Sequence, residues 1–227
     1  MNPDITVLAD NDFCKIINDN FFFLGLFLSH LIGSIPFGFL LSKLSGHGDI
    51  RKIGSGNIGA TNVLRTGNKK LAAFVLFLDA AKGGIAAFAL SALLADSSCG
   101  ENTYTVFALL FGLSAILGHC FPIWLKFKGG KGVATAIGVL LAAVPLAGLA
   151  ACGIWLLSAF AFRISSLAAL IATASAPLVT FFVYGDTPAL ITLLIAALVF
   201  MRHKDNIKRL IKGEEPKIGK KKEKAET

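Results

Sequence analysis

Charged residues are scarce in this chain, and the places where they are missing are informative. Only 16% of the 227 residues are Asp, Glu, Lys or Arg, and the mean hydropathy is +0.70. Three long runs contain none of these four residue types: Tyr104–Leu125, Val133–Phe162 and Ser166–Tyr184. Because a run of about 18 apolar residues is already typical of a transmembrane helix, an ordinary soluble domain is excluded.

Several signatures of metal-dependent and nucleophilic chemistry are missing as well. The four cysteines form no CxxC pair and share no zinc-site spacing with a histidine; they are Cys14, Cys99, Cys120 and Cys152. No carboxylate pair recurs at metal-binding spacing, so we expect neither a metal nor a cofactor. The chain also lacks His-x4-Asp, Gly-x-Ser-x-Gly and a nucleotide P-loop.

The first twenty residues lack the basic n-region of a cleaved signal peptide. We predict a polar N-terminal extension over residues 1–20, a single transmembrane domain over residues 21–213, and a charged cytoplasmic tail over residues 214–227. The net charge of +8 comes from residues between the hydrophobic spans and in the tail. Basic residues in such places orient a membrane protein, so we expect no nucleic acid partner.

Five spans are predicted directly from hydrophobicity: Phe21–Leu44, Leu71–Ala95, Tyr104–Leu125, Ser166–Tyr184 and Pro188–Met201. The run Val133–Phe162 is ambiguous. As one helix it would be about 45 Å long, whereas the hydrocarbon core is about 30 Å thick. The alternative is a hairpin of two short helices that breaks near Pro145–Gly148.

The basic residues favour the hairpin. If the run is a hairpin, Lys15 is the one basic residue in a loop or terminus that lies on the outer side of the membrane. With a single helix, Arg163 and the basic tail would move to the outside, against the positive-inside rule. We therefore predict an all-α polytopic membrane protein of seven transmembrane helices, some short or partial, with the N-terminus outside and the C-terminus cytoplasmic.

The segment Asp49–Arg65, between the first two spans, is rich in glycine and in polar and basic residues. Glycine lets backbone N–H groups converge on a ligand, and basic side chains select an anionic one. Two further polar segments, Lys126–Thr135 and Arg202–Arg209, are predicted to lie on the same face. Together they predict a site for phosphorylated molecules at the membrane surface.

Individual residues in these segments have alternative interpretations. Lys131 and the glycines around it precede an apolar helix, which is typical either of an anion site or of a flexible turn. His203 has Asn206 one helical turn later, and it would serve as an acid–base group or as a phosphate ligand. Asp79 and Lys82 share a helix face inside a span, which predicts a structural ion pair, with a supporting role at the site as the alternative.

Five motifs occur in order along the chain: Gly33-Ser-Ile-Pro-Phe-Gly38, Gly54-Ser-Gly-Asn-Ile-Gly-Ala-Thr-Asn62, Gly118-His-Cys-Phe-Pro122, Lys128-Gly-Gly-Lys-Gly-Val-Ala-Thr135 and Arg202-His-Lys-Asp-Asn-Ile-Lys-Arg-Leu210. Together they resemble the bacterial acyl-phosphate–glycerol-3-phosphate acyltransferase family, from about residue 21 to residue 213. The resemblance implies a multi-pass enzyme of the bacterial inner membrane whose active site faces the cytoplasm. It would move a fatty acyl group from acyl phosphate to the 1-hydroxyl of sn-glycerol 3-phosphate, giving lysophosphatidic acid and phosphate. Transient contact with the enzyme that makes acyl phosphate is also implied.

The resemblance further implies roles for particular residues. Ser55 and His203 would be catalytic. The acyl-phosphate headgroup would be held by the glycine-rich loop, through Gly54, Gly56, Asn57, Gly59, Ala60, Thr61 and Asn62. Glycerol 3-phosphate would be held by Arg65, Lys131, His203 and Asn206, with Ser166 nearby.

From the residues themselves, direct attack by the glycerol hydroxyl is favoured over a covalent acyl-Ser55, since no base lies near Ser55 in the sequence. The proton acceptor stays open between a substrate phosphate oxygen and His203. Two other classes compete with this function. A transporter of anionic solutes would fit a broken helix with basic loops, although we find no internal repeat. A CDP-alcohol phosphotransferase would need an Asp-rich metal motif that the sequence lacks.

Overall fold

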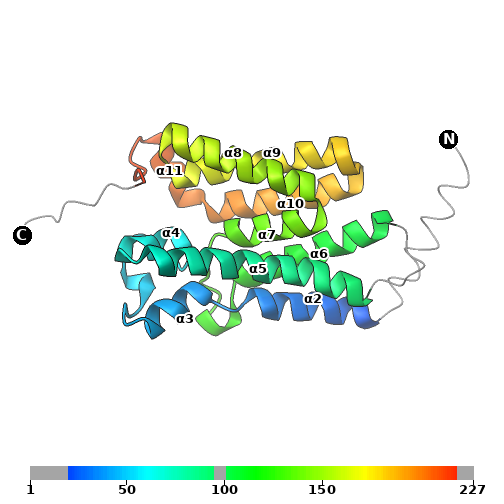
Figure 1. The fold of residues 1–227 in the computed structure, drawn as a ribbon, viewed down its shortest axis with the longest axis horizontal. Helices are drawn as coiled ribbons and strands as arrows, with labels where there is room; N and C mark the ends of the chain where they lie inside the picture. The colour runs from blue at the N-terminus through cyan, green and yellow to red at the C-terminus, as the bar shows by residue number, and fades with distance from the viewer. Residues whose placement is uncertain (1–19, 95–100, 219–227) are drawn as a thin grey trace, which may run out of the picture.

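The computed structural model describes residues 20–94 and 101–218, and these residues form helices and connecting loops without a β-strand (Figure 1). The predicted N-terminal extension before Asn20 and residues 219–227 of the predicted tail lie outside the described residues. The helices in order are α2 (Asn20–Gly33), α3 (Phe37–Leu44), η1 (Ile50–Lys52), α4 (Ala60–Val63), η2 (Leu64–Thr66), α5 (Lys69–Leu94), α6 (Glu101–Cys120), η3 (Ile123–Leu125), α7 (Val133–Ala143), α8 (Pro145–Phe162), α9 (Ser165–Tyr184), α10 (Asp186–Arg202) and α11 (Lys204–Ile211).

The prediction of an all-helical protein with several membrane spans is confirmed. Among the described residues, five segments are long and apolar enough to cross a bilayer, and α10 with α11, bent by 66°, makes a sixth. The predicted hairpin is also present, because the chain breaks at Val144 between α7 and α8. With 11 residues, α7 is about 16 Å long, roughly half of the hydrocarbon core. The count of seven crossings and the orientation stay predictions.

The short helix α7 lies at the centre of the molecule (Figure 1). It packs against α5 and α6 on one side and α8 on the other, while α9 and α10 pack together and α10 contacts α6. Its residues Val139, Leu140 and Ala143 belong to the largest buried apolar cluster. A half-length helix is tolerated at membrane depth where protein surrounds it.

Close packing of small residues holds the central helices together. A Cβ atom added to Gly138 of α7 would lie 1.9 Å from the carbonyl oxygen of Ala80, and one added to Gly33 of α2 would lie 2.0 Å from that of Ala115. Helices in lipid associate largely through such contacts, because the lipid is as apolar as their side chains. No larger residue fits at these two positions without moving a helix.

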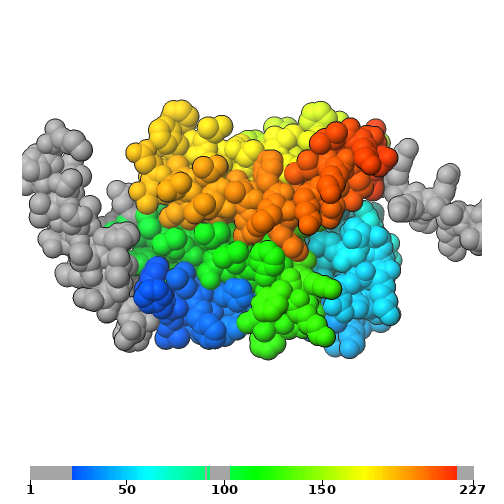
Figure 2. Space-filling view, turned by 180° about the vertical axis from the view of Figure 1, so that it is seen from behind, coloured from blue at the N-terminus to red at the C-terminus, as the bar shows by residue number. Residues whose placement is uncertain are grey.

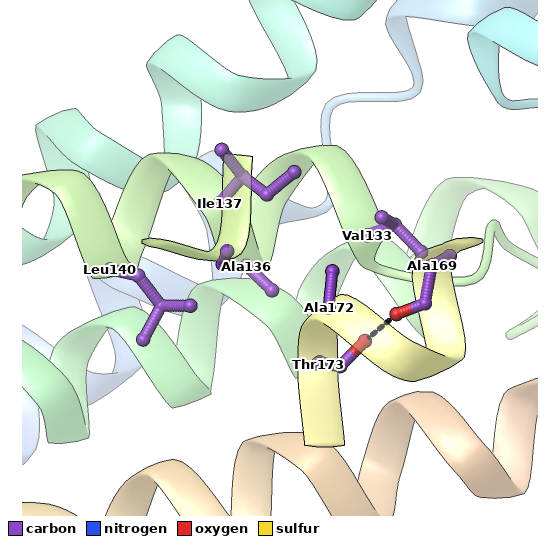
Figure 3. Close-up of a pocket in the computed structure, with 8 residues that line it drawn as sticks. Val133, Ala136, Ile137, Leu140, Ala169, Ala172 and Thr173 are labelled. Atoms are coloured by element: carbon purple, nitrogen blue, oxygen red, sulfur yellow. Dashed lines mark hydrogen bonds between the residues drawn. The ribbon is translucent and has the colours of Figure 1, made fainter. Parts of the chain in front are cut away.

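The contact between α7 and α9 leaves a cavity of about 10 Å³ beside Ala136, Ala172 and Thr173 (Figure 3). The Thr173 hydroxyl is turned back onto the carbonyl oxygen of Ala169 in its own helix. A cavity of this size is just large enough for one water molecule, so it is a packing gap between the helices.

The first predicted span is interrupted, which the hydropathy did not indicate. Helix α2 ends at Gly33 and α3 begins at Phe37, after Pro36. The carbonyl oxygen of Ile35 at this break accepts a hydrogen bond from Lys82 Nζ at 2.8 Å. The same ammonium group lies 2.7 Å from Asp79 Oδ1, and both side chains are 3% exposed. The predicted ion pair is therefore present, and it joins α5 to the break.

Replacing Asp79 with Ala is expected to destabilise the protein by about 3–5 kcal/mol, because Lys82 would remain buried without its counter-charge. The double variant Asp79→Leu/Lys82→Met, which buries no charge, should recover part of this loss, since the Ile35 carbonyl still loses its donor. Thermal unfolding of the purified protein in detergent measures both. A double variant no more stable than the single one would contradict the ion-pair explanation.

Candidate active site

The polar segments predicted to share one face lie at one end of the molecule. Helices α3, α4 and α11 occupy the same end in Figure 1. Figure 2 shows the surface around residues 50–65, in cyan, against that of α11 and the residues after it, in orange-red, with the segment near residues 120–130 beside them. A hydroxyl–hydroxyl contact of 3.4 Å between Thr61 and Ser165 joins the glycine-rich loop to the start of α9.

The glycine-rich loop is organised around the side chain of Asn62, which is 2% exposed. The two N–H groups of its amide are shared among three carbonyl oxygens, those of Ile50 at 3.0 Å, Ile53 at 2.9 Å and Asn57 at 2.8 Å. Its amide oxygen accepts from the backbone N–H of Ser55 at 3.0 Å. With all these partners inside the loop, Asn62 shapes the loop, and this arrangement favours a structural role over direct contact with substrate.

Ser55 is exposed at the tip of this loop. Its hydroxyl lies 3.2 Å from Asn62 Oδ1, an amide oxygen that cannot take up a proton as a catalytic base would. Gly54 precedes it with φ of 57°, and a Cβ there would lie 2.5 Å from Asn62 Oδ1 and 2.7 Å from Arg65 Cδ. Gly54 therefore lets Arg65 lie directly against the loop.

The other predicted loop residues surround this centre. Gly56 has φ of 72°, and Gly59 is the N-cap of α4, whose first residues are Ala60 and Thr61. The N–H groups of α4's first turn are satisfied in part by the Gly59 carbonyl, which accepts from Asn62 and Val63.

The Lys131 segment is held from two sides. A Cβ on Gly130 would lie 2.0 Å from His119 Nε2, so the loop is pressed onto that imidazole. From the other side, the guanidinium of Arg202 donates to the carbonyl oxygens of Gly130 and Gly129, both at 3.1 Å. Gly132 then caps α7 with φ of 84°. Sequence reasoning assigned no role to Arg202, because its carbonyl partners are some seventy positions away.

Lys131 points across the site to α11. Its Nζ donates to Asn206 Oδ1 at 2.6 Å, which brings together two of the predicted glycerol 3-phosphate ligands. Burial lowers the pKa of Lys131 to about 8; the nearby carboxylate of Glu215 opposes this shift, while Arg209 and Arg65 add to it. Lys131 is therefore a cation at neutral pH, and the positive charge of Arg65 is one of those that lower its pKa.

His203 follows the end of α10 and is 3% exposed. Its Nδ1 lies 2.8 Å from the carbonyl oxygen of Val199. Because a carbonyl oxygen only accepts, Nδ1 carries the proton and Nε2 is left as an acceptor. Burial lowers the pKa of His203 to about 4, with the Val199 hydrogen bond opposing the shift. The imidazole is thus neutral at pH 7.

Ser166, at the start of α9, reaches the same cluster through a residue that the sequence analysis placed in the tail. Its hydroxyl donates to Glu215 Oε1 at 2.7 Å, and the amide of Asn206 donates to the same oxygen. No sequence signal set Glu215 apart from its neighbour Glu214. The contacts thus bring Lys131, Asn206 and Ser166 together, with Arg65 near Lys131, while Ser55 is bonded within its own loop. Among the described residues, no three His, Cys, Asp or Glu side chains converge as metal ligands.

Replacing Asn62 with Asp is expected to lower kcat/KM for the acyl transfer that the resemblance implies at least about 100-fold. The two N–H donors are lost and a carboxylate faces three carbonyl oxygens, which together cost about 3 kcal/mol. Asn68→Asp is the matched control. Asn68 accepts a hydrogen bond from the N–H of Leu71 through its side-chain oxygen, and a carboxylate does this equally well. Steady-state rates of both variants, with melting temperatures, test the expectation. Similar rates for the two would show that Asn62 does not organise the loop.

Comparisons with known proteins agree with this architecture. The family model of glycerol-3-phosphate acyltransferase matches residues 23–213. The glycerol-3-phosphate acyltransferase of Jannaschia sp. (strain CCS1) is 54% identical over 193 residues, which cover 85% of this chain and 91% of the relative. That of Caulobacter vibrioides (strain NA1000 / CB15N) is 56% identical over 196 residues, covering 85% and 86%.

Solved structures agree as well. A crystal structure of PlsY (YgiH), an integral membrane glycerol 3-phosphate acyltransferase, in its glycerol 3-phosphate form matches with a TM-score of 0.78 and 41% identity, covering 87% of this chain and 96% of that one. Its lysophosphatidic acid form matches with a TM-score of 0.77 and 40% identity, covering 87% and 95%. The chain belongs to the glycerol-3-phosphate acyltransferase family.

Proposed function

We propose that this protein transfers a fatty acyl group from acyl phosphate to the 1-hydroxyl of sn-glycerol 3-phosphate, giving lysophosphatidic acid and phosphate. The observation that carries the proposal is that two groups of residues lie side by side at one end of the family fold. One is the glycine-rich loop, which contacts the start of α9 through Thr61, and the other is Lys131 with Asn206. Two sets of anion-binding groups side by side suit two phosphorylated substrates.

The glycine-rich loop binds the phosphate of acyl phosphate. Ser55 is exposed on it, and Arg65 lies against Gly54. The backbone N–H groups of the loop and the Ser55 hydroxyl form an anion site that needs no metal, and Arg65, which also acts on Lys131, belongs to the glycerol 3-phosphate side next to it. Gly56 turns the loop with a positive φ, the Asn57 carbonyl accepts from the Asn62 amide, and Gly59 precedes Ala60 and Thr61 at the start of α4.

An apolar groove of about 350 Å³ lies next to this loop, between α3 and η3. Phe39 and Leu125 line it, and both pack in the apolar cluster that contains Ile50 and Ile58 of the loop segment. An acyl chain in the groove would therefore bring its headgroup to Ser55, and the rest of the chain would stay in lipid.

Glycerol 3-phosphate binds on the other side of the site. Lys131 donates one of its three N–H groups to Asn206, which leaves two for the phosphate. The start of α7 adds backbone N–H groups next to Lys131, and Ser166 and Arg65 complete the set. The neutral His203 presents Nε2 as an acceptor that orients a glycerol hydroxyl.

The reaction is direct attack. The 1-hydroxyl oxygen of glycerol 3-phosphate bonds to the acyl carbonyl carbon, and the bond from that carbon to the phosphate oxygen breaks. The electron pair leaves with the phosphate, and the hydroxyl proton goes to a phosphate oxygen. His203 with a pKa of about 4 is a weak base at neutral pH, so it positions the hydroxyl. Ser55 has an amide oxygen beside it, which supports a binding role over nucleophilic attack.

The same proposal includes the topology. Seven crossings, with α7 as a partial one, place α3, α4 and α11 on the cytoplasmic side of the bacterial inner membrane and the N-terminus outside. This orientation gathers the basic residues of loops and tail in the cytoplasm. The site then faces soluble glycerol 3-phosphate, and contact with the enzyme that makes acyl phosphate stays a prediction.

Replacing Ser55 with Ala is expected to lower kcat about 100-fold or more, as removal of one donor to a developing charge does in other enzymes. The assay is phosphate release from acyl phosphate in lipid vesicles, which should depend on glycerol 3-phosphate and persist in EDTA. Ser45→Ala, in an exposed turn, is the control. Full activity of the Ser55 variant would exclude the loop role.

Two results would contradict the wider proposal. Acyl phosphate mixed with enzyme alone should leave no acyl group on the protein, and an acyl-Ser55 adduct would rule out direct attack. Uptake of a phosphorylated solute into vesicles, without any acyl transfer, would identify a transporter.

Lys131 should set an alkaline limit to activity. Its ammonium form, present below the pKa of about 8, binds the phosphate, so kcat/KM for glycerol 3-phosphate should fall as the pH rises through about 8. The substrate phosphate itself titrates near pH 6 and does not cause this fall. This fall is the alkaline limb of the pH profile. Lys131→Arg, which stays charged, should abolish the alkaline limb, while Lys128→Arg, at an exposed lysine of the same loop, should keep it. Persistence of the limb in Lys131→Arg would assign it to another group.

A further inference from the structure

The segment after α11 turns back toward the site. Gly213 has φ of 70°, the N–H of Glu214 donates to the Arg209 carbonyl at 2.8 Å, and the N–H of Ile218 donates to the Arg163 carbonyl at 2.6 Å. These bonds hold the segment between the end of α11 and the turn before α9. They place Glu215, whose side chain is 8% exposed, under the residues that bind substrate.

The Glu215 carboxylate has three donors from two elements. Ser166 Oγ and Asn206 Nδ2 donate to Oε1, and Arg209 Nε donates to Oε2 at 2.6 Å. Burial on its own would raise the pKa of Glu215, but these hydrogen bonds outweigh it and lower the pKa. The group is therefore an anion whenever the enzyme is active.

Asn206 lies between this anion and a cation. Its Nδ2 faces the carboxylate of Glu215, and its Oδ1 faces the ammonium of Lys131. A flipped amide would set donor against donor and acceptor against acceptor, so only one orientation is stable. Lys131 is thereby directed at a fixed oxygen and retains two free N–H groups.

We propose that Glu215 is a positioning residue for glycerol 3-phosphate: it fixes the amide of Asn206 and supplies the negative charge that keeps Lys131 in its phosphate-binding form. The inference rests on the proposed function, which assigns glycerol 3-phosphate to Lys131. It adds to the site a residue from the segment after α11 that touches no substrate itself.

The charges around Lys131 come from several elements and act in both directions. Arg65 of η2 and Arg209 of α11 disfavour its ammonium form, while Asp205 and Glu215 favour it. Arg202 and His203 flank the cluster at the end of α10, with His203 neutral. Of the two carboxylates, Glu215 has the larger favourable effect on Lys131, and it contacts the far side of the amide to which Lys131 donates.

Glu215→Gln is the decisive variant, since Gln still accepts from Ser166 and Asn206 through Oε1 but carries no charge. Its Nε2 then faces Arg209 Nε in place of the accepting oxygen, a donor–donor contact that the double variant with Arg209→Gln removes. We expect KM for glycerol 3-phosphate to rise about tenfold, with KM for acyl phosphate unchanged. The alkaline limb of kcat/KM should move to lower pH by roughly one unit. Glu214→Gln, at the exposed neighbour, should change none of these values.

A second substitution separates charge from folding. Arg209→Gln removes a positive charge from the same cluster, so it should move the limb to higher pH, and Glu215→Gln/Arg209→Gln should restore the limb close to its original position. If Glu215→Gln fails to fold, the upward shift in Arg209→Gln still tests the charge balance. A residue that merely stabilised the fold would alter yield and melting temperature but leave the limb unmoved.

Two outcomes would overturn the inference. An unmoved limb with unchanged KM in Glu215→Gln would show that Glu215 does not act on Lys131. A lowered KM for glycerol 3-phosphate would show that the carboxylate competes with the phosphate for its site. Absence of acyl transfer from the unmodified protein would instead contradict the proposed function.

Discussion

Every break in a helix at membrane depth exposes backbone groups that lipid cannot hydrogen-bond, and this constraint governs the structure. The chain meets it with charged side chains from neighbouring helices. Lys82 of α5 donates to the Ile35 carbonyl between α2 and α3. The loop before α7 uses the same kind of contact, since Arg202 at the end of α10 donates to the carbonyls of Gly129 and Gly130. In each case a cation from another helix donates to carbonyl oxygens that lack a helical partner.

Contacts of this kind from side chains to the backbone also explain why the site is ordered. The segment that carries Lys131 has three glycines and would be mobile by composition alone. It is held between His119 and Arg202, so Lys131 starts from a fixed backbone. The glycine-rich loop is held in the same way by a single buried amide, that of Asn62. Preorganised groups of this kind bind developing charge without reorganising during the reaction.

Much of the architecture could be predicted from the sequence, because hydrophobicity and length decide it. The apolar spans and the Asp79–Lys82 pair follow from patterns within one helix, whereas the break before Pro145 follows from length together with the distribution of basic residues along the chain. The break before Pro36 was missed, although proline disfavours helix in the preceding residue; the apolar run on both sides concealed it. Contacts between distant segments leave no local pattern. Glu215 reads as part of a charged tail until the fold brings Ser166, 49 positions away, against it.

The chemistry of the proposed donor accounts for the weak acid–base groups found here. An acyl phosphate is a mixed anhydride whose leaving group is a stable phosphate anion, so little proton transfer is needed before the carbonyl is attacked. Holding a hydroxyl near that carbonyl can by itself lower the barrier by several kcal/mol. A histidine with a pKa of about 4 and a serine paired with an amide would serve poorly in an ester hydrolase. In the proposed reaction they suffice, because the free energy stored in the acyl phosphate replaces a strong base.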